Sequence, residues 1–497
     1  MRAIVIGAGF GGIASAIRLK AKGYDVHLID RCGRLGGRAQ VFEKDGYRHD
    51  AGPTVITAPF LLRELFELLG AHFENYVNLV PLPLWYRFRF PDGTTFDYGG
   101  TLEDTLAEIE RISPFDVAGY RALVAESERI YDVGFKQLAD QPFHRFGAML
   151  RCLPAMIRLG SRRTVWQLVS RHLRHDKLRQ AFSVQPLLVG GNPFTTTSIY
   201  SLIHFLERAH GVHFVMGGTG ALVDGLERVM REAGVHIRLG TTVSAIDTAE
   251  GRVTGVTLED GQRLAADLVV SNADPAFVYA HLLDRREVDL SARVKTKFAR
   301  KSMGLFVLFF GTEGTYDDVA HHTIWLGSRY RELLDDIFHK KILAEDFSLY
   351  LHRPTATDPS FAPPGHDSFY ALVPVPNLDG AVDWSVEGDW LRGRVIDALD
   401  RSILPGLKGR IRSDFFMTPE DFQTDYLSPD GAGFSIAPHF LQSAWFRFHN
   451  KSEGPKNLFL VGAGTHPGAG LPGVLSSAKV LERLVADVGR APHAQGG

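Results

Sequence analysis

A glycine-rich turn near the start of the chain limits its possible folds more than any other sequence feature. The apolar run Ala3–Ile6 predicts a short buried strand, and the apolar residues after the turn recur at helical spacing. Gly7, Gly9 and Gly12 lie between these two elements in a G-x-G-x-x-G pattern. Strand, glycine turn and helix in this order are typical of the first unit of a Rossmann-like, dinucleotide-binding domain.

Each glycine of this turn has its own expected role in binding a dinucleotide. Gly7 permits the tight turn, Gly9 lets the backbone approach a pyrophosphate, and Gly12 lets helix and strand pack closely. The pyrophosphate would then face the free N–H groups at the positive end of the helix. Asp30 follows the second strand, Val26–Ile29, where an acid can hydrogen-bond the ribose. The complete arrangement makes a turn without a nucleotide the weaker interpretation.

Two later segments repeat the α/β pattern. Residues 217–239 predict a helix and then a strand, residues 252–270 a β-hairpin, and Asn457–Val461 a strand that leads through a glycine-rich loop into a helix. We therefore expect an α/β fold whose Rossmann-like nucleotide-binding domain is assembled from discontinuous segments, residues 1–70, 215–290 and 451–490. Residues 71–214 and 291–450 would form an inserted, mixed α+β substrate domain with a helical, membrane-facing region.

Charge, cysteine content and hydropathy exclude several other classes. The 497 residues have a formal net charge of −2, so no basic field favours a nucleic-acid partner. The two cysteines, Cys32 and Cys152, have neither metal-ligand nor disulfide spacing, which favours a reducing cytoplasm. No uncharged apolar run approaches the ~20 residues of a membrane span; the longest, Met303–Phe310, predicts a buried strand. The adjacent His321 and His322 should not share one strand face, so we expect no metal site.

Two further loops favour a flavin over a nicotinamide. Gly36, Gly37 and Arg38 follow Asp30 closely, and this Gly-Gly-Arg is similar to the flavin-binding extension of the amine oxidase and carotenoid desaturase superfamily. The loop Gly462–Val474 holds five glycines and two prolines before a helix, which suits close backbone approach to something flat or anionic. The helix N-terminus that follows could face the flavin edge that becomes negative on reduction.

The segment Leu460–Ala478, LVGAGTHPGAGLPGVLSSA, closely resembles the C-terminal signature of the bacterial-type phytoene desaturase family. The resemblance covers nearly the whole chain. It extends to the segments Leu187–Ile203, Gly217–Leu222, Ser271–Asp274, Ala320–Arg331, Ala344–His352 and Gln442–Asn450.

The resemblance implies FAD as the cofactor and hydrogen removal from a C40 polyene as the reaction. By position it carries FAD binding over to Gly7, Gly9, Gly12, Asp30, Gly36, Gly37, Arg38, Val243, Gly462, Ala463, Gly464, Gly473 and Val474. It implies conversion of 15-cis-phytoene and partly desaturated carotenoids to lycopene or neurosporene, with oxygen or a quinone as the electron acceptor. A hydroxycarotenoid or C30 desaturase keeps the same fold, whereas a non-catalytic prenyl-binding escort would not need the intact nucleotide motif.

No established pair of catalytic residues stands out. The sequence contains no H-E-x-x-H and no G-x-S-x-G. Arg151 and His466 are the candidates for stabilising charge near the flavin, His466 because it lies in the signature loop. Ala148 stands where relatives of this family carry an acid, which weakens an acid–base role for that segment.

The substrate is insoluble, so it must be taken from lipid. Residues 145–179 interleave eight arginines and one lysine with large apolar side chains and contain one acid, Asp176. This pattern suits helices lying in an anionic membrane surface, although helices packed on the protein would produce it too. We therefore expect a cytoplasmic protein that attaches peripherally to the inner face of the cell membrane.

Overall fold

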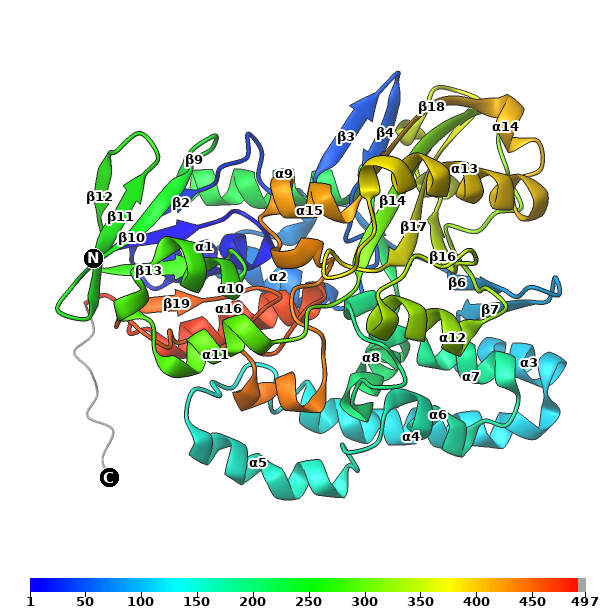
Figure 1. Ribbon diagram of the computed structural model, residues 1–497, viewed down its shortest axis with the longest axis horizontal. Helices are drawn as coiled ribbons and strands as arrows, with labels where there is room; N and C mark the ends of the chain where they lie inside the picture. Colours follow the sequence, from blue (N-terminus) through cyan, green and yellow to red (C-terminus); the bar gives the residue numbers. More distant parts are fainter. Residues whose placement is uncertain (490–497) are drawn as a thin grey trace.

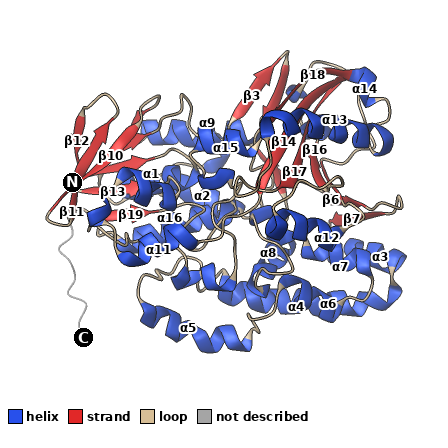
Figure 2. Cartoon of the chain, viewed as in Figure 1, coloured by secondary structure: helices blue, strands red, loops and turns tan. Residues whose placement is uncertain are grey.

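The computed structural model describes residues 1–489, so residue 490, the last of the predicted segment 451–490, lies outside it. Its two largest β-sheets have five and seven strands, and a group of helices lies below the seven-stranded sheet in the view of Figure 1. Figure 2 shows that helices flank both sheets and that long loops run between them. No helix within residues 1–489 is long and apolar enough to cross a membrane.

The first sheet is parallel and combines strands from three distant segments. Its order is β19-β13-β1-β2-β9. The bounds are β1 Arg2–Ile6, β2 Asp25–Ile29, β9 His236–Arg238, β13 Leu268–Ser271 and β19 Leu458–Leu460. Ala3 and Val5 of β1 belong to one core, Ile4 and Ile6 to another. The alternation follows from the two-residue period of a strand, and it gives this sheet a covered core on both faces.

One predicted element is wrong in this region. Residues 263–270 do not form a single hairpin strand: β11 (Arg252–Leu258) pairs with β12 (Arg263–Ala265), whereas β13 pairs with β1 in the parallel sheet. All four residues of β13 are buried, as suits a strand covered on both faces. The three-stranded sheet β10-β11-β12, with β10 at Val243–Ala249, stands separately.

The second sheet joins the two insertions. Its order is β18-β14-β17-β16-β15-β6-β7, so strands from before residue 100 pair with strands from after residue 300. The bounds are β6 Leu84–Arg89, β7 Thr95–Gly99, β14 Gly304–Glu313, β15 His322–Trp325, β16 Leu349–His352, β17 His366–Val375 and β18 Ile411–Met417. The predicted strand at Met303–Phe310 is β14. Its side chains alternate, with Phe306 and Leu308 in the core that contains α13 (Trp384–Ser402), and Leu305 and Val307 on a cavity wall.

Helices pack around both large sheets. Around the parallel sheet lie α1 Phe10–Ala21, α2 Pro59–Glu67, α9 Gly218–Glu232, α10 Pro275–Phe277, α11 Leu290–Phe298 and α16 Leu471–Leu484. The remaining helices are α3 Leu102–Ile112, α4 Val117–Gly134, α5 Phe146–Arg158, α6 Val165–His172, α7 Asp176–Ser183, α8 Leu202–His210, α12 Tyr330–Asp335, α14 Leu407–Arg410 and α15 Pro419–Tyr426. The short pairs β3 Val41–Lys44 with β4 Tyr47–Asp50, and β5 Leu79–Pro81 with β8 His213–Val215, close the gaps.

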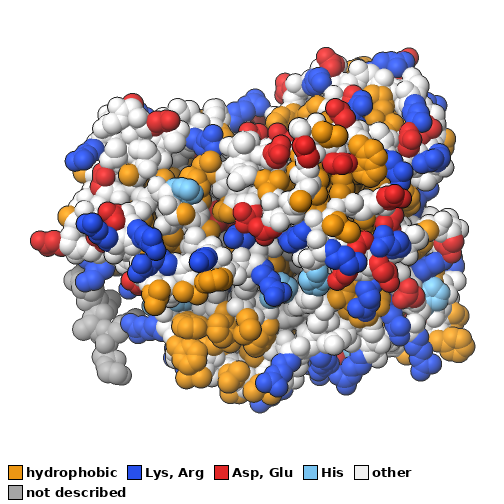
Figure 3. Space-filling view, in the orientation of Figure 1, with side chains coloured by type: hydrophobic (Ala, Val, Ile, Leu, Met, Phe, Trp, Pro, Cys, Tyr) orange, Lys and Arg blue, Asp and Glu red, His pale blue; other side chains and the backbone are white. Residues whose placement is uncertain are grey.

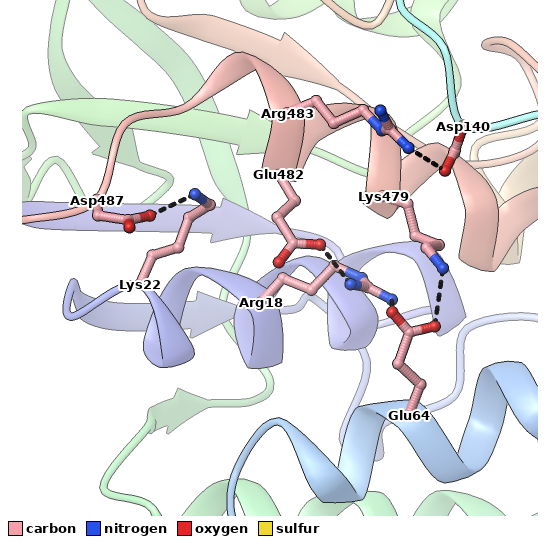
Figure 4. A network of polar contacts seen from close by, with 8 residues as sticks. All are labelled: Arg18, Lys22, Glu64, Asp140, Lys479, Glu482, Arg483 and Asp487. Carbon is pink, nitrogen blue, oxygen red and sulfur yellow. Dashed lines mark hydrogen bonds and ion pairs between the residues drawn. The ribbon is translucent and has the colours of Figure 1, made fainter. Parts of the chain in front are cut away.

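An ion-pair network fastens the chain's two ends together. Arg18 of α1 is almost fully buried and its guanidinium pairs with Glu64 of α2 at 3.0 Å and with Glu482 of α16 at 2.5 Å. Lys479 of α16 reaches the other oxygen of Glu64 at 2.9 Å (Figure 4). Because Arg18 binds both carboxylates and Glu64 binds both cations, the network holds α1, α2 and α16 in one arrangement beside the sheet.

Candidate functional site

A cavity of about 590 Å³ is lined by residues from both large sheets and from the loops and helices between them. One end is lined by the loops that follow β1, β2, β13 and β19, at the carboxyl ends of the parallel strands. The other end is lined by apolar side chains of α5, α8 and β14. Ligands bind in α/β sheets at this strand edge, where neighbouring connections run to opposite sides. The geometry therefore offers a polar nucleotide end and an apolar substrate end in one space.

The N-terminal turn is shaped as the glycine pattern predicts. Gly7 has φ +90°, a conformation that favours glycine, and a Cβ atom at Gly12 would lie 1.9 Å from the Gly7 carbonyl oxygen. Gly7 and Gly9 line the cavity, whereas Gly12 does not, because it sits where α1 packs on the turn. A Cβ atom at Gly9 would lie 2.7 Å from Nδ2 of Asn272.

Asn272 joins the two glycine loops. It follows β13, and its Oδ1 would lie 2.3 Å from a Cβ atom at Gly11 and 2.7 Å from one at Gly462. Nucleotide loops from opposite ends of the chain therefore meet around one side chain. The family resemblance covers Asn272 within Ser271–Asp274 but implies no role for its side chain.

Asp30 lies on the cavity wall and is buried. Its Oδ2 accepts from the backbone N–H of Ala8 at 2.5 Å and its Oδ1 from that of Cys32 at 2.7 Å. A carboxylate has about four acceptor sites, so these bonds leave capacity for a ribose hydroxyl. Burial and the neighbouring Asp30 charge raise the pKa of the Cys32 thiol to about 11, which keeps that thiol neutral.

The Gly36-Gly37-Arg38 loop also lines the cavity, as does Val243 of β10. The Arg38 guanidinium donates to the Gly433 carbonyl at 2.5 Å and to the Ser428 hydroxyl at 2.9 Å. These bonds tie the loop to the inserted part of the chain. Both partners are neutral, so the charge of Arg38 is balanced by neither, and burial lowers its pKa.

The C-terminal loop forms the wall between the nucleotide end and the apolar end. Gly462, Ala463, Gly464, Gly473 and Val474 all line the cavity. α16 begins at Leu471, three residues before the predicted start at Val474. Part of the glycine content serves internal packing, because a Cβ atom at Gly464 would lie 2.4 Å from Cδ of Pro275.

Two buried side chains that sequence reasoning missed hold this loop. Arg447 donates to the carbonyl of Thr465 at 2.9 Å and of Ala463 at 2.6 Å, and also reaches those of Ile436 and Gln442. Asn450 donates to the His466 carbonyl at 3.0 Å. Both residues lie in the segment Gln442–Asn450, one of the segments that carry the family resemblance, and that was the available signal.

The two predicted catalytic residues lie in different surroundings. His466 lines the cavity, its Nε2 contacts the Leu138 carbonyl at 2.9 Å, and its buried Nδ1 has no hydrogen-bond partner among residues 1–489. Burial lowers the pKa of His466 to about 4, so the ring is neutral. Arg151 is exposed on α5 and does not line the cavity, whereas Met149, Cys152 and Met156 of the same helix do.

Polar side chains that the sequence did not single out also reach the cavity. The Thr54 hydroxyl bonds those of Tyr350 and Tyr370 at 3.0 and 2.9 Å, and all three residues line the wall. Glu207 of α8 lines it too and is fully buried. Segment 51–54 is held in place by Asp50, whose Oδ2 accepts from the Thr219 N–H of α9 at 2.8 Å.

A histidine cluster lies beside this wall. Ring nitrogens of His321, His322 and His352 lie within 4.8 Å of one another, so the expectation that the first two point apart is wrong. His322 begins β15 and His321 precedes it, so strand alternation does not separate them. Burial lowers the pKa of His321 to about 3 and holds those of His322 and His352 well below their usual range. The His322 Nδ1 lies 2.6 Å from the Tyr350 hydroxyl.

These residues fit a flavin dinucleotide. A glycine turn and the N-terminus of α1 lie at the polar end, where Asp30 keeps acceptor capacity and Arg38, whose hydrogen bonds go to neutral groups, supplies positive charge. A second glycine loop and the N-terminus of α16 lie at the junction with the apolar end, where a ring system would meet a hydrocarbon. The geometry supports oxidation chemistry on an apolar substrate.

Comparisons with known proteins agree with this geometry. Residues 10–480 match the family described as flavin containing amine oxidoreductase. A lycopene-forming phytoene desaturase of Pseudescherichia vulneris is 47% identical over 485 residues, 97% of this chain and 99% of that protein. A neurosporene-forming phytoene desaturase of Rhodobacter capsulatus is 45% identical over 492 residues, 98% of this chain and 94% of that protein.

Solved structures share the fold at low sequence identity. An oxidoreductase from Methanosarcina mazei superposes with a TM-score of 0.66 at 18% identity, over 97% of this chain and 100% of its own. Cyclohexylamine oxidase from Brevibacterium oxydans superposes with a TM-score of 0.63 at 15% identity, over 97% and 98%. These likenesses concern the fold alone.

Proposed function

The chain belongs to the flavin-containing amine oxidoreductase family and is an FAD-dependent oxidoreductase, and we propose that it desaturates phytoene stepwise to lycopene. The observation that carries the proposal is the continuity of the cavity: the two glycine loops and an apolar wall of α5, α8 and β14 enclose one space. A hydrocarbon offers no hydrogen-bonding group, so such a wall can hold it only by shape and exclusion of water.

FAD supplies an acceptor for a hydride, which suits removal of hydrogen from adjacent carbons. We propose that Gly7, Gly9, Asp30 and Arg38 bind its phosphate and ribose parts, with Gly36, Gly37, Val243, Gly462–Gly464, Gly473 and Val474 around the rest. Gly12 serves by allowing α1 to pack on the turn. The neutral His466 keeps the signature loop against Leu138, which positions the loop beside the substrate space.

Repetition of the reaction follows from the same apolar wall. Recognition by shape discriminates methylene-scale differences by only ~1–3 kcal/mol, so a partly desaturated intermediate of equal length binds again. The relatives from Pseudescherichia vulneris and Rhodobacter capsulatus form lycopene and neurosporene, respectively, and lycopene is the end product that we favour. Oxygen or a quinone then takes up the electrons.

We propose that the substrate enters from a membrane beside α5. This helix lines the cavity with Met149 and Met156, while Leu150 and Ile157 are 53% and 67% exposed. Figure 3 shows hydrophobic side chains gathered over this part of the surface. Trp445 contacts Phe146 of α5 with ring centroids 5.0 Å apart, and Lys295 of α11 lies 5.9 Å from the Trp445 ring centroid, so the patch continues toward α11.

Only part of the basic and apolar segment at residues 145–179 can therefore face the membrane. α6 buries Val165, Leu168 and Val169 in the protein core, so its apolar face is not free for lipid. α11, which the sequence did not single out, adds Leu290, Val294 and Phe298, all exposed at four-residue spacing. An apolar patch of this kind, rimmed by lysines and arginines, suits an anionic interface.

The test is incubation of FAD-loaded protein with phytoene in liposomes and oxygen or a quinone. Absorbance should move stepwise toward longer wavelength as conjugation grows, and chromatography should end at lycopene. Accumulation of neurosporene would correct the end product. Unchanged phytoene, with consumption of a hydroxylated or C30 carotenoid, would overturn the substrate.

A further inference from the structure

We infer that Glu207 is the catalytic base that takes up the proton lost from the substrate, an inference that rests on the proposed desaturation. Glu207 lies on α8, whose Leu202, Ile203 and Leu206 line the apolar end of the cavity. The Glu207 side chain is fully buried and lines the same wall. A hydrocarbon substrate has no use for a carboxyl group there unless that group takes part in the reaction.

The reaction leaves a proton to be placed. A hydride departs from one carbon with its electron pair and passes to the flavin. The C–H bond of the adjacent carbon breaks, its electron pair forms the new π bond, and its proton forms an O–H bond with the Glu207 carboxylate. The carboxyl releases this proton to solvent before the next step, while the proposed acceptor, oxygen or a quinone, reoxidises the flavin. Each double bond therefore needs one base with a free oxygen beside the substrate.

Glu207 meets that requirement and the other cavity acids do not. Its Oε1 accepts from the Tyr86 hydroxyl at 3.0 Å, whereas its Oε2 is buried and has no partner within residues 1–489. Asp30 follows β2 at the nucleotide end, away from the apolar wall, and each of its oxygens accepts from a backbone N–H group. Asp274 accepts from the Ala276 N–H at 2.9 Å and the Ser435 hydroxyl at 2.5 Å. Asp425 lies near Cys32 at the nucleotide end.

The electrostatic surroundings suit a base of moderate strength. The guanidinium of the neighbouring Arg208 donates to the Thr105 hydroxyl and the Gly100 carbonyl, so it forms no ion pair with Glu207. Burial raises the pKa of Glu207 to about 8, against the opposing effects of the Tyr86 hydrogen bond and Arg208. The titratable and charged groups around it are His204 and Arg208 of α8, Tyr86 of β6, Tyr98 of β7, Tyr120 of α4, His322 of β15 and Tyr350 of β16.

The direction of the pH dependence follows. Glu207 accepts a proton only when ionised, and with a pKa of about 8 roughly a tenth is ionised at pH 7. The rate of flavin reduction by phytoene should therefore rise with pH through about 8. Burial lowers the pKa of His204 to about 3 and holds that of His322 well below its usual range, so neither contributes a rise in this window.

The test is anaerobic single-turnover reduction of the flavin by phytoene across pH 6 to 10. Glu207→Gln keeps the shape and the acceptor for Tyr86 but cannot take a proton. We expect full FAD content, a rate about 10²–10⁴-fold lower and loss of the rise with pH. Wild-type rates and an unchanged profile in this variant would overturn the inference. If wild-type protein leaves phytoene unchanged, the proposed function fails instead.

Two further measurements do not depend on the Gln variant being fully active or folded. Tyr86→Phe removes the hydrogen bond that favours the ionised carboxylate, so the inflection should move to higher pH. Infrared spectra of the unreacted protein should contain a protonated-carboxyl C=O band that disappears on titration through about pH 8 and is missing in Glu207→Gln. An unmoved inflection in Tyr86→Phe, or the absence of such a band, would overturn the assignment.

Discussion

Replacing Gly9 by valine should separate cofactor binding from folding. Gly9 precedes α1 with φ −71° and ψ 174°, which any residue adopts, so the backbone needs no glycine there. A Cβ atom would lie 2.7 Å from Nδ2 of Asn272, the end of a side chain that can turn away. The fold should therefore survive, while the valine occupies the space that the pyrophosphate needs.

The expected loss of affinity follows from the contacts that would be displaced. A hydrogen bond to a charged group contributes about 1.5–3 kcal/mol, so losing two backbone bonds to phosphate costs ~3–6 kcal/mol. At 1.4 kcal/mol for each tenfold change, FAD should bind roughly 10²–10⁴-fold more weakly.

The assay is the flavin-to-protein absorbance ratio of the purified variant, followed by calorimetric titration of apoprotein with FAD. Gly33→Val is the matched control, because Gly33 lies in the neighbouring loop and a Cβ atom there meets nothing within 4 Å. Circular dichroism should match wild type for both variants. A full complement of FAD in Gly9→Val would refute the placement of the cofactor.

Three further predictions concern the loop, the pH response and the membrane face. Arg447→Met should lower the free energy of unfolding by ~3–5 kcal/mol in urea titrations, because several buried carbonyls lose their donor. Wild-type stability in Arg447→Lys would show that the fork of donors is unimportant. The pKa of His466 is about 4 in the folded protein and ordinary in the unfolded chain, so its stabilising contribution is complete above pH 6.5 and falls by ~3 kcal/mol as the pH drops toward 4. His466→Gln should flatten this dependence of the unfolding free energy on pH. An unchanged slope in that variant would contradict the account. The double variant Leu150→Glu/Ile157→Glu should no longer co-sediment with anionic liposomes. Val386→Glu, which changes an exposed apolar residue on α13, should still co-sediment. Equal binding by the wild type, the double variant and Val386→Glu would exclude α5 as the docking face.

Local patterns predicted the elements that bind a nucleotide because their signals are short-range. The spacing of Gly7, Gly9 and Gly12, the strand before them and Asp30 after the next strand depend on neighbours within about one βαβ unit. The structure places these elements as expected, with β1 at Arg2–Ile6, α1 at Phe10–Ala21 and β2 at Asp25–Ile29. The predicted hairpin at residues 252–270 is partly wrong, because an alternation of apolar residues indicates a strand but does not indicate which strand it pairs with. Residues 263–265 pair within the hairpin, whereas residues 268–271 pair with β1 in another sheet.

The sequence by itself indicated the family, FAD as the cofactor and phytoene desaturation as the reaction, because these rest on contiguous motifs and on a resemblance that covers nearly the whole chain. Tertiary structure alone decided which side chains lie in the cavity wall and which pack behind it. Glu207, Arg447 and the three clustered histidines are ordinary residues in their own segments. They reach their contacts around the cavity only because strands from before residue 100 pair with strands from after residue 300, and because β19 pairs with β13. Burial then removes water from those side chains, and this loss of solvation gives Glu207 a pKa that no local pattern could indicate.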